Sequence, residues 1–300
     1  MVRLSDILKA YLSSPAAPPK RNATQRQKNL FNLVLKTANC TNLQCLRSVP
    51  ESTMIAVNDE LISHTPSNSG GGQIGALHGF GPAPDGKTIP DLPLAMFKNG
   101  QFYKGLKGLI LGSMAFEGMG TSHDTDLPGY FPILVRQQMP SASNATVKVL
   151  QDEYYDPNEL PKMAWDWTTD VVFACTANNL ANALPNLARR YIMSTPPATH
   201  GQDLECKLLP VQKRTSLLIM KLDFFNDGNA TAVNNTGLVN GFQRRLIAFV
   251  NGQKLDWPAW SSAKSMYNIT ERFKVTTLPK TLADRCDLLN KFILDPANGA

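Results

Sequence analysis

The 300-residue chain lacks the long apolar run that a membrane-spanning helix needs. No stretch approaches about 18 consecutive apolar residues, so we expect no integral membrane span. The first residues, MVRLSDILKAYLSSPAAPPKR, begin like a signal peptide, but Asp6 and Lys9 interrupt their apolar part. We therefore expect no signal peptide in this chain, and instead a short amphipathic helix that ends at the proline-rich SPAAPP segment.

Concentrated basic charge is missing as well. The formal net charge is +6, yet the longest basic clusters are the pairs KR (20–21), RR (189–190) and RR (244–245). A nucleic-acid-binding surface typically carries a basic stripe with interleaved aromatic residues, and this sequence has none. We expect no nucleic-acid partner and interpret the basic residues as ordinary surface charge.

Metal-ligand and dinucleotide motifs are also missing. Among the five cysteines only Cys40 and Cys45 stand close together, and no second Cys or His pair has the spacing of a zinc site. The segment GGGQIG (70–75) matches G-x-G-x-x-G, but a dinucleotide fingerprint must follow a strand and open a helix. Turn-rich sequence flanks it on both sides, so we interpret it as a surface loop. The sequence therefore predicts no metal and no cofactor.

The cysteines and the glycosylation sequons indicate a compartment. A bond between Cys40 and Cys45 would require an oxidising environment. Five is an odd number, and the sequence leaves open how Cys175, Cys206 and Cys286 pair. Six asparagines begin N-x-S/T sequons, roughly twice the chance number, which favours the secretory pathway. These predicted glycosylation sites are Asn22, Asn39, Asn144, Asn229, Asn234 and Asn268.

Apolar patterning predicts helices that alternate with buried strands. The alternation is typical of an α/β fold with a parallel sheet, and the run at 106–114, apolar on both faces, suits a central strand. Residues 52–62 are ambiguous between helix and strand, and the C-terminal tail is expected to be polar and broken. The predicted helices are 24–38, a short one before Asn99–Gly100, 171–184 and 238–253; the predicted strands are 106–114, 189–195 and, as an option, 215–225.

Glu117 and His200 are the candidate catalytic groups. Glu117 follows directly on the strand 106–114, and functional groups of open parallel sheets gather at such strand ends. His200 lies 200 − 117 = 83 positions later, in the loop PPATHGQDL after the next predicted strand. A carboxylate can orient an imidazole and stabilise its protonated form. Glu followed by His is also the chain order of the last two triad members in α/β-hydrolases.

Other interpretations of these residues stay open. Glu117 can be an ordinary solvated carboxylate of a loop. Asp203, three positions after His200, can pair with the imidazole or only shape the loop. The remaining histidines lie in turn-rich or polar loop sequence and are weaker candidates: His64, His78 and His123.

A recognisable nucleophile is missing. No serine stands in G-x-S-x-G, because Ser113 has Leu111 and Ala115 in the two glycine positions and Ser69 has Ser67 before it. No cysteine has a nucleophile context, and no early glycine-rich oxyanion motif is present. A Glu–His pair without an activated nucleophile predicts no appreciable nucleophilic catalysis from this polypeptide alone.

Residues 85–118, DGKTIPDLPLAMFKNGQFYKGLKGLILGSMAFEG, resemble the type B carboxylesterase/lipase family, the cholinesterase-like α/β-hydrolases, and especially its fungal secreted members. In that family a D-G-x-x-x-P-D-x-P segment leads through a short helix to a strand that ends in E-G. The triad acid is that Glu, which maps onto Glu117. The triad histidine lies in an H-G-x-D-like loop, which maps onto His200. The segment NCTNLQCLRSVP is similar to the small disulfide loop of the family, which implies a bond between Cys40 and Cys45.

The resemblance implies a fold, a reaction and a location. It runs from about residue 20 almost to the end, so 1–20 is a non-family segment and 21–300 a partial carboxylesterase domain. The implied activity is hydrolysis of a small-molecule or lipid ester through an acyl-enzyme: Ser attacks, His moves the proton, and Glu orients His. An extracellular location is implied as well.

The chain also departs from the family. It matches the part that follows the nucleophile elbow, and the G-E-S-A-G motif, the oxyanion loop and the early strands have no counterpart in it. Residues 63–79 and 206–228 do not resemble the family. We therefore expect a fragment or a decayed paralogue. The alternative function is a non-catalytic, cholinesterase-like binding module.

Overall fold

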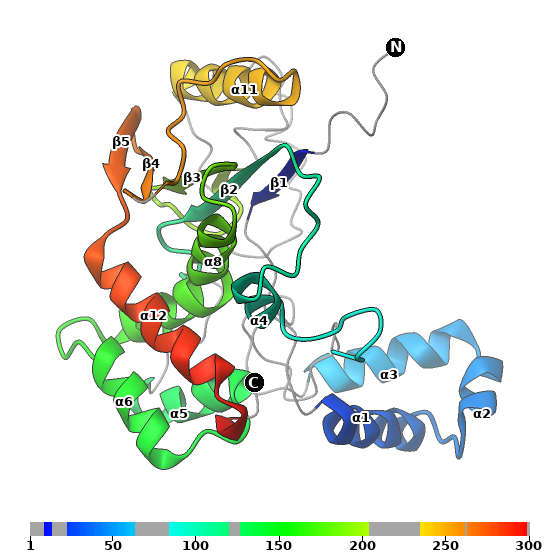
Figure 1. The fold of residues 1–300 in the computed structure, drawn as a ribbon. Helices are drawn as coiled ribbons and strands as arrows, with labels where there is room; N and C mark the ends of the chain where they lie inside the picture. The colour runs from blue at the N-terminus through cyan, green and yellow to red at the C-terminus, as the bar shows by residue number, and fades with distance from the viewer. Residues whose placement is uncertain are drawn as a thin grey trace, which may run out of the picture.

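A five-stranded sheet forms the centre of the fold (Figure 1). The computed structural model describes residues 9–13, 23–63, 84–119, 127–203, 235–261 and 263–298. The strand order is β1-β2-β3-β4-β5; the first four strands are parallel, and β5 is antiparallel to β4. The strands are β1 (Lys9–Ser13), β2 (Gly108–Met114), β3 (Ala188–Met193), β4 (Ser265–Ile269) and β5 (Phe273–Thr277). The predicted mostly parallel α/β sheet is thereby confirmed.

Helices cover both faces of the sheet. Leu109 and Leu111 of β2 pack toward α8 (Cys175–Ala183), whereas Ile110 packs toward α11 (Thr236–Val250). Every residue of β2 is buried, as the continuous apolar run predicts for a strand between two helical layers. Burying Ile110 or Leu111 contributes about 1.5–3 kcal/mol each, so β2 is a rigid base for the residues that follow it.

A second core lies beyond the sheet, where helices pack on one another. Its centre is an aromatic cluster in which the Trp167 ring lies 5.2 Å from Phe131 and 5.5 Å from Tyr154, centroid to centroid. Both contacts are edge-on, the arrangement that aromatic pairs favour. The elements around this core are α4 (Pro93–Lys98), α5 (Leu127–Gln138), α6 (Asn144–Tyr154), α7 (Leu160–Thr168), the π-helical turn η3 (Thr169–Ala174), α12 (Lys280–Leu294) and the short 3-10 turn η5 (Pro296–Asn298).

The first three helices form a small unit with its own apolar cluster, to one side of the sheet in Figure 1. The Asn42 side chain caps α2 by accepting the Cys45 N–H at 2.9 Å. The Cys40–Cys45 disulfide implied by the family resemblance is present. These helices are α1 (Ala23–Thr37), α2 (Leu43–Ser48) and α3 (Glu51–Ser63).

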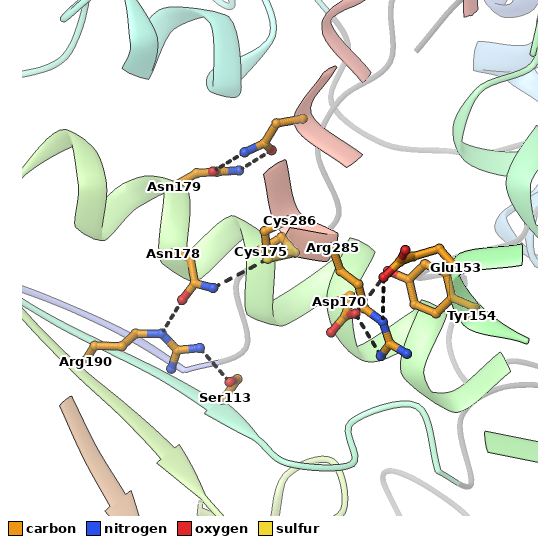
Figure 2. The surroundings of a disulfide bond; sticks show 11 residues. Ser113, Glu153, Tyr154, Asp170, Cys175, Asn178, Asn179, Arg190, Arg285 and Cys286 are labelled. Atoms are coloured by element: carbon orange, nitrogen blue, oxygen red, sulfur yellow. Dashed lines mark hydrogen bonds and ion pairs between the residues drawn. A yellow bond between two sulfur atoms is a disulfide. The ribbon is translucent and has the colours of Figure 1, made fainter. Parts of the chain in front are cut away.

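A second disulfide, Cys175–Cys286, ties α8 to α12 (Figure 2). Beside it, Asp170 of η3 accepts a hydrogen bond from the Tyr154 hydroxyl at 3.0 Å, and an Arg285 nitrogen lies 3.7 Å from the same carboxylate. Burial raises the pKa of Asp170 to about 7, and the Arg285 charge partly offsets that rise. The π-helical turn is thus attached to α12 by one disulfide and by the contact between Asp170 and Arg285.

Two sequence expectations are wrong at the chain ends. Residues 9–13 form the parallel strand β1 rather than part of a helix, because pairing with β2 satisfies their backbone groups. The tail is not broken, because it forms β4, β5 and α12. The two strands are only five residues long, so their apolar pattern is a weak sequence signal. The ambiguous stretch 52–62 is helix α3, and the predicted helices and strands elsewhere agree with α1, α4, α8, α11, β2 and β3.

Several predictions fall outside the described residues. They concern the GGGQIG loop, the optional strand at 215–225 and Cys206. Among the helices in the described part of the chain, none is long and apolar enough to cross a membrane.

The two disulfides are expected to differ in their contribution to stability. Replacing Cys175 and Cys286 together by serine should lower the free energy of unfolding by about 5 kcal/mol, because that bond closes a loop of 111 residues. Replacing Cys40 and Cys45, only 5 residues apart, should cost about 2 kcal/mol. Denaturant titration of both double variants measures the difference, and equal losses would contradict it.

Asp170 should make stability depend on pH. Its folded pKa of about 7 exceeds the ordinary value of 3.8, so the folded protein retains this proton more readily than the unfolded chain does. The stabilisation is complete below about pH 4 and is lost as the pH rises to about 7, at up to about 1.4 kcal/mol per pH unit. The unfolding free energy of the wild type minus that of Asp170→Asn should therefore fall over this range and then level off. Parallel stability curves for the two proteins would show that Asp170 does not titrate there.

Candidate active site

Glu117 lies in the turn that directly follows β2, with no solvent exposure. The turn folds back on the strand end, so the backbone N–H of Met114 donates to Glu117 Oε1 at 2.7 Å. The same turn is bonded to the loop after β3, since the Phe116 N–H donates to the Ala198 carbonyl at 3.0 Å. The carboxylate is therefore fixed on one side by its own strand and held beside the neighbouring loop.

His200 lies in that neighbouring loop, and its ring meets Glu117. The distance from His200 Nδ1 to Glu117 Oε2 is 2.6 Å, and the histidine side chain is 9% exposed. Ala198 and Gly201, on either side of His200, have positive φ angles of 59° and 80°, which turn the loop back toward the sheet. The ring of Phe173, from η3, packs against the imidazole at 5.0 Å between centroids.

Asp203 stabilises the loop that carries His200, whereas Nδ1 of His200 bonds to Glu117. Its carboxylate is buried and accepts a hydrogen bond from the hydroxyl of Tyr191, on β3. Tyr191 reaches over β2 at Gly112, where a Cβ atom would lie 2.0 Å from the tyrosine ring. A glycine is therefore required at this crossing. Of the two carboxylates the sequence offered, Glu117 is the one whose hydrogen bond to Nδ1 orients the imidazole.

A buried cation lies near the pair. Arg190 of β3 has no solvent exposure and donates to the Ser113 hydroxyl at 2.8 Å and to the Asn178 side chain at 3.2 Å (Figure 2). Burial lowers the pKa of Arg190 to about 10, while interactions with Tyr191 and Glu117 act in the opposite direction. The guanidinium therefore stays charged at neutral pH. Ser113 is occupied as its partner inside β2, which agrees with its lack of a nucleophile motif.

The arrangement can perform general acid–base chemistry. A carboxylate at Nδ1 fixes the neutral imidazole in the tautomer with the proton on that nitrogen and stabilises the imidazolium when a second proton arrives. The lone pair is then on Nε2, the atom that can remove a proton from a hydroxyl group. Low exposure strengthens the interaction, because little water competes for the carboxylate.

In the described part of the chain, no other predicted site residue joins this pair. Within the described ranges, no group of three or more His, Cys, Asp or Glu side chains could hold a metal ion. Asn39 and Asn144 are exposed, whereas Asn268 is half-buried in β4 with its side-chain oxygen buried. The remaining predicted residues lie outside the described chain: His64, His78, His123, Asn22, Asn229 and Asn234.

Three residues around the pair were not predicted from the sequence. The interpretation of Arg190 as surface charge is wrong, because its side chain is fully buried. Its place in the apolar strand ARRYIM was a usable signal, since a charged residue inside a buried strand needs partners. The others carry no local signal, since their roles depend on how η3 and α12 pack. The three residues are Arg190, Thr169 and Phe173.

No family model matches the chain. Two curated fungal relatives, both named carboxylesterase patB, are 24% identical in Penicillium expansum and 23% identical in Aspergillus clavatus, over 251 residues. The alignments cover 79% of this chain but 39% and 40% of the relatives, so the chain spans about two fifths of the length of the curated relatives it matches.

Solved esterase structures share the fold. EstA from Aspergillus niger superposes with a TM-score of 0.75 at 16% identity, over 98% of this chain and 59% of that chain. A structure named PNB esterase gives 0.68 at 18% identity, over 93% of this chain and 57% of that chain. The chain therefore has the α/β-hydrolase fold that these structures share. The two fungal carboxylesterases and these solved structures support the resemblance to the type B carboxylesterase family, the cholinesterase-like α/β-hydrolases.

Proposed function

We propose that the protein takes part in the hydrolysis of carboxylic esters, with Glu117 as the acid and His200 as the base of a Ser–Glu–His triad. The observation that carries the proposal is the 2.6 Å contact between His200 Nδ1 and Glu117 Oε2, inside a nearly closed environment. The substrate is an ester of a small molecule or a lipid. Names of relatives such as carboxylesterase and PNB esterase support this class.

Each residue has one task in this reaction. His200 Nε2 takes the proton of a serine hydroxyl as the oxygen attacks the ester carbonyl, and it returns that proton to the leaving alcohol. In the second half, a water molecule gives its proton to Nε2 while its oxygen attacks the acyl group, and the proton returns to the serine. Glu117 stabilises the imidazolium that forms in both halves.

The serine itself is not supplied by these 300 residues in a recognisable motif. The polypeptide alone is therefore expected to have no appreciable esterase activity. The same lack of G-x-S-x-G favours a second function, a non-catalytic binding module in which the Glu–His pair persists without a nucleophile. The two functions differ in whether the native protein that carries this chain hydrolyses esters.

The protein enters the secretory pathway in this proposal. Two disulfides within the described chain support an oxidising compartment. Asn39 and Asn144 are exposed and can accept a glycan on the folded protein, so they are the preferred sequons. Asn268 lies in β4, paired with Ile192 of β3 on one side and Lys274 of β5 on the other. A glycan on Asn268 would therefore have to be attached before the sheet forms.

Ester hydrolysis by two preparations tests the proposal. The 300-residue chain should show no hydrolysis of p-nitrophenyl butyrate that a serine-directed organophosphate inhibits. In the native protein carrying this chain, Glu117→Gln and His200→Gln should each lower kcat/KM by about 10²–10⁴, because the base loses its orientation or is removed. Glu159→Gln, which makes the same change at an exposed carboxylate outside the pair, is the control and should leave kcat/KM unchanged.

Each outcome decides one part of the proposal. Inhibitor-sensitive hydrolysis by the 300-residue chain would show that it does contain a nucleophile. Native activity that survives His200→Gln would contradict the assignment of the base. A native protein without any esterase activity would contradict hydrolysis and support the binding module.

A further inference from the structure

The long helix beside the candidate pair contains a π-helical turn. Helix α7 continues through η3 into α8, and in this turn the Cys175 N–H bonds to the Asp170 carbonyl, five residues back. Turns of this kind are rare inside α-helices and occur frequently at functional sites. The widened turn lies where the helix passes the end of β2, so its residues meet the loop that carries Glu117.

Two side chains of the turn face the candidate pair. Thr169 Oγ1 accepts the backbone N–H of Gly118, the residue directly after Glu117, at 3.0 Å. Four residues later, Phe173 packs on the imidazole of His200. The hydroxyl therefore contacts the turn that carries Glu117 and Gly118, called the acid loop below. The aromatic ring contacts the base, His200.

The acid loop and the helix approach each other closely at Gly118. A Cβ atom on Gly118 would lie 2.3 Å from the Trp165 carbonyl oxygen and 2.8 Å from the Thr168 Cβ. Such distances leave no room for any side chain, so the backbone after Glu117 lies directly on the helix. This close packing keeps the Gly118 N–H within hydrogen-bond reach of Thr169 Oγ1.

The opposite side of the turn is fixed to α12. Asp170 lies beside Arg285, and Cys175 is bonded to Cys286, the next residue of α12 (Figure 2). The backbone that presents Thr169 is thus tied down by a covalent bond and by a buried polar contact. An acceptor placed on so rigid an element keeps its position when the loop fluctuates.

We propose that Thr169 is a positioning residue for the Glu117–His200 pair, because its hydroxyl anchors the Gly118 amide and so fixes the direction of the Glu117 carboxylate. The inference rests on the proposed function, in which that carboxylate orients the base. Thr169 touches neither reacting atoms nor the imidazole; it acts through the backbone of the acid loop. Losing the anchor frees the turn between Met114 and Gly118 and weakens the bond to Nδ1.

The neighbouring threonine provides a matched control. Thr168 is also buried on the same helix, but within the described chain its hydroxyl has no hydrogen-bond partner. Thr168→Val and Thr169→Val make the same chemical change one residue apart. Only Thr169→Val removes the acceptor of the Gly118 N–H in the acid loop. The comparison therefore separates the general effect of losing a buried hydroxyl from the loss of this hydrogen bond.

The test measures how fast the His200 Nδ1 proton exchanges with water, by NMR of the 300-residue chain labelled with ¹⁵N-histidine. His200→Gln identifies the resonance, and Glu117→Gln should abolish it. Thr169→Val should speed its exchange at least about fivefold, while Thr169→Ser and Thr168→Val should stay within about twofold of the wild type. Unchanged amide exchange in β2 shows that the variants are folded; if Thr169→Val does not fold, the smaller Thr169→Ala replaces it.

The outcomes separate this inference from the proposed function. If Glu117→Gln leaves the proton resonance intact, the pair itself fails and the proposed function with it. If Glu117→Gln abolishes the resonance but Thr169→Val exchanges like the wild type, only the positioning role of Thr169 is overturned. Equal acceleration in Thr168→Val, or no rescue by Thr169→Ser, would overturn it too.

Discussion

The contact between Glu117 and His200 is the interaction on which the rest of the site depends. A carboxylate with no solvent exposure is unstable unless hydrogen-bond donors or a cation compensate for the lost water. Here the Met114 amide and the imidazole supply those donors, and the charge of Arg190 lies behind them. The turn after β2 and the loop after β3 must therefore stay adjacent, since separating them would leave the carboxylate buried and unpaired.

The surrounding fold keeps the two segments adjacent through contacts on several sides. Parallel pairing of β2 with β3 brings both strand ends to one edge of the sheet. Tyr191 reaches across Gly112 to bind Asp203, which fixes the far end of the histidine loop. On the other side, the long helix packs against Gly118 and is itself tied to α12 by Cys175–Cys286.

Sequence reasoning found the pair because each member follows a strand with a clear apolar signal. The strand ends and the chain order made Glu117 and His200 candidates, and the resemblance to the carboxylesterase family assigned them as a pair. The chain ends were misjudged, because β1 and β5 depend on backbone pairing with neighbouring strands, which no local pattern records. Cys175–Cys286 was equally hidden, since the partners are 111 residues apart and meet only after η3 and α12 pack.

The central claim is that Glu117 holds His200 as an oriented base, and the tautomer of the imidazole tests it most directly. In ¹⁵N spectra of the histidine-labelled chain at neutral pH, the account predicts that His200 carries its proton on Nδ1 and has an unprotonated Nε2. Glu117→Gln should remove this preference. The reverse tautomer in the wild type, or nitrogen shifts averaged as in a free imidazole, would contradict the account.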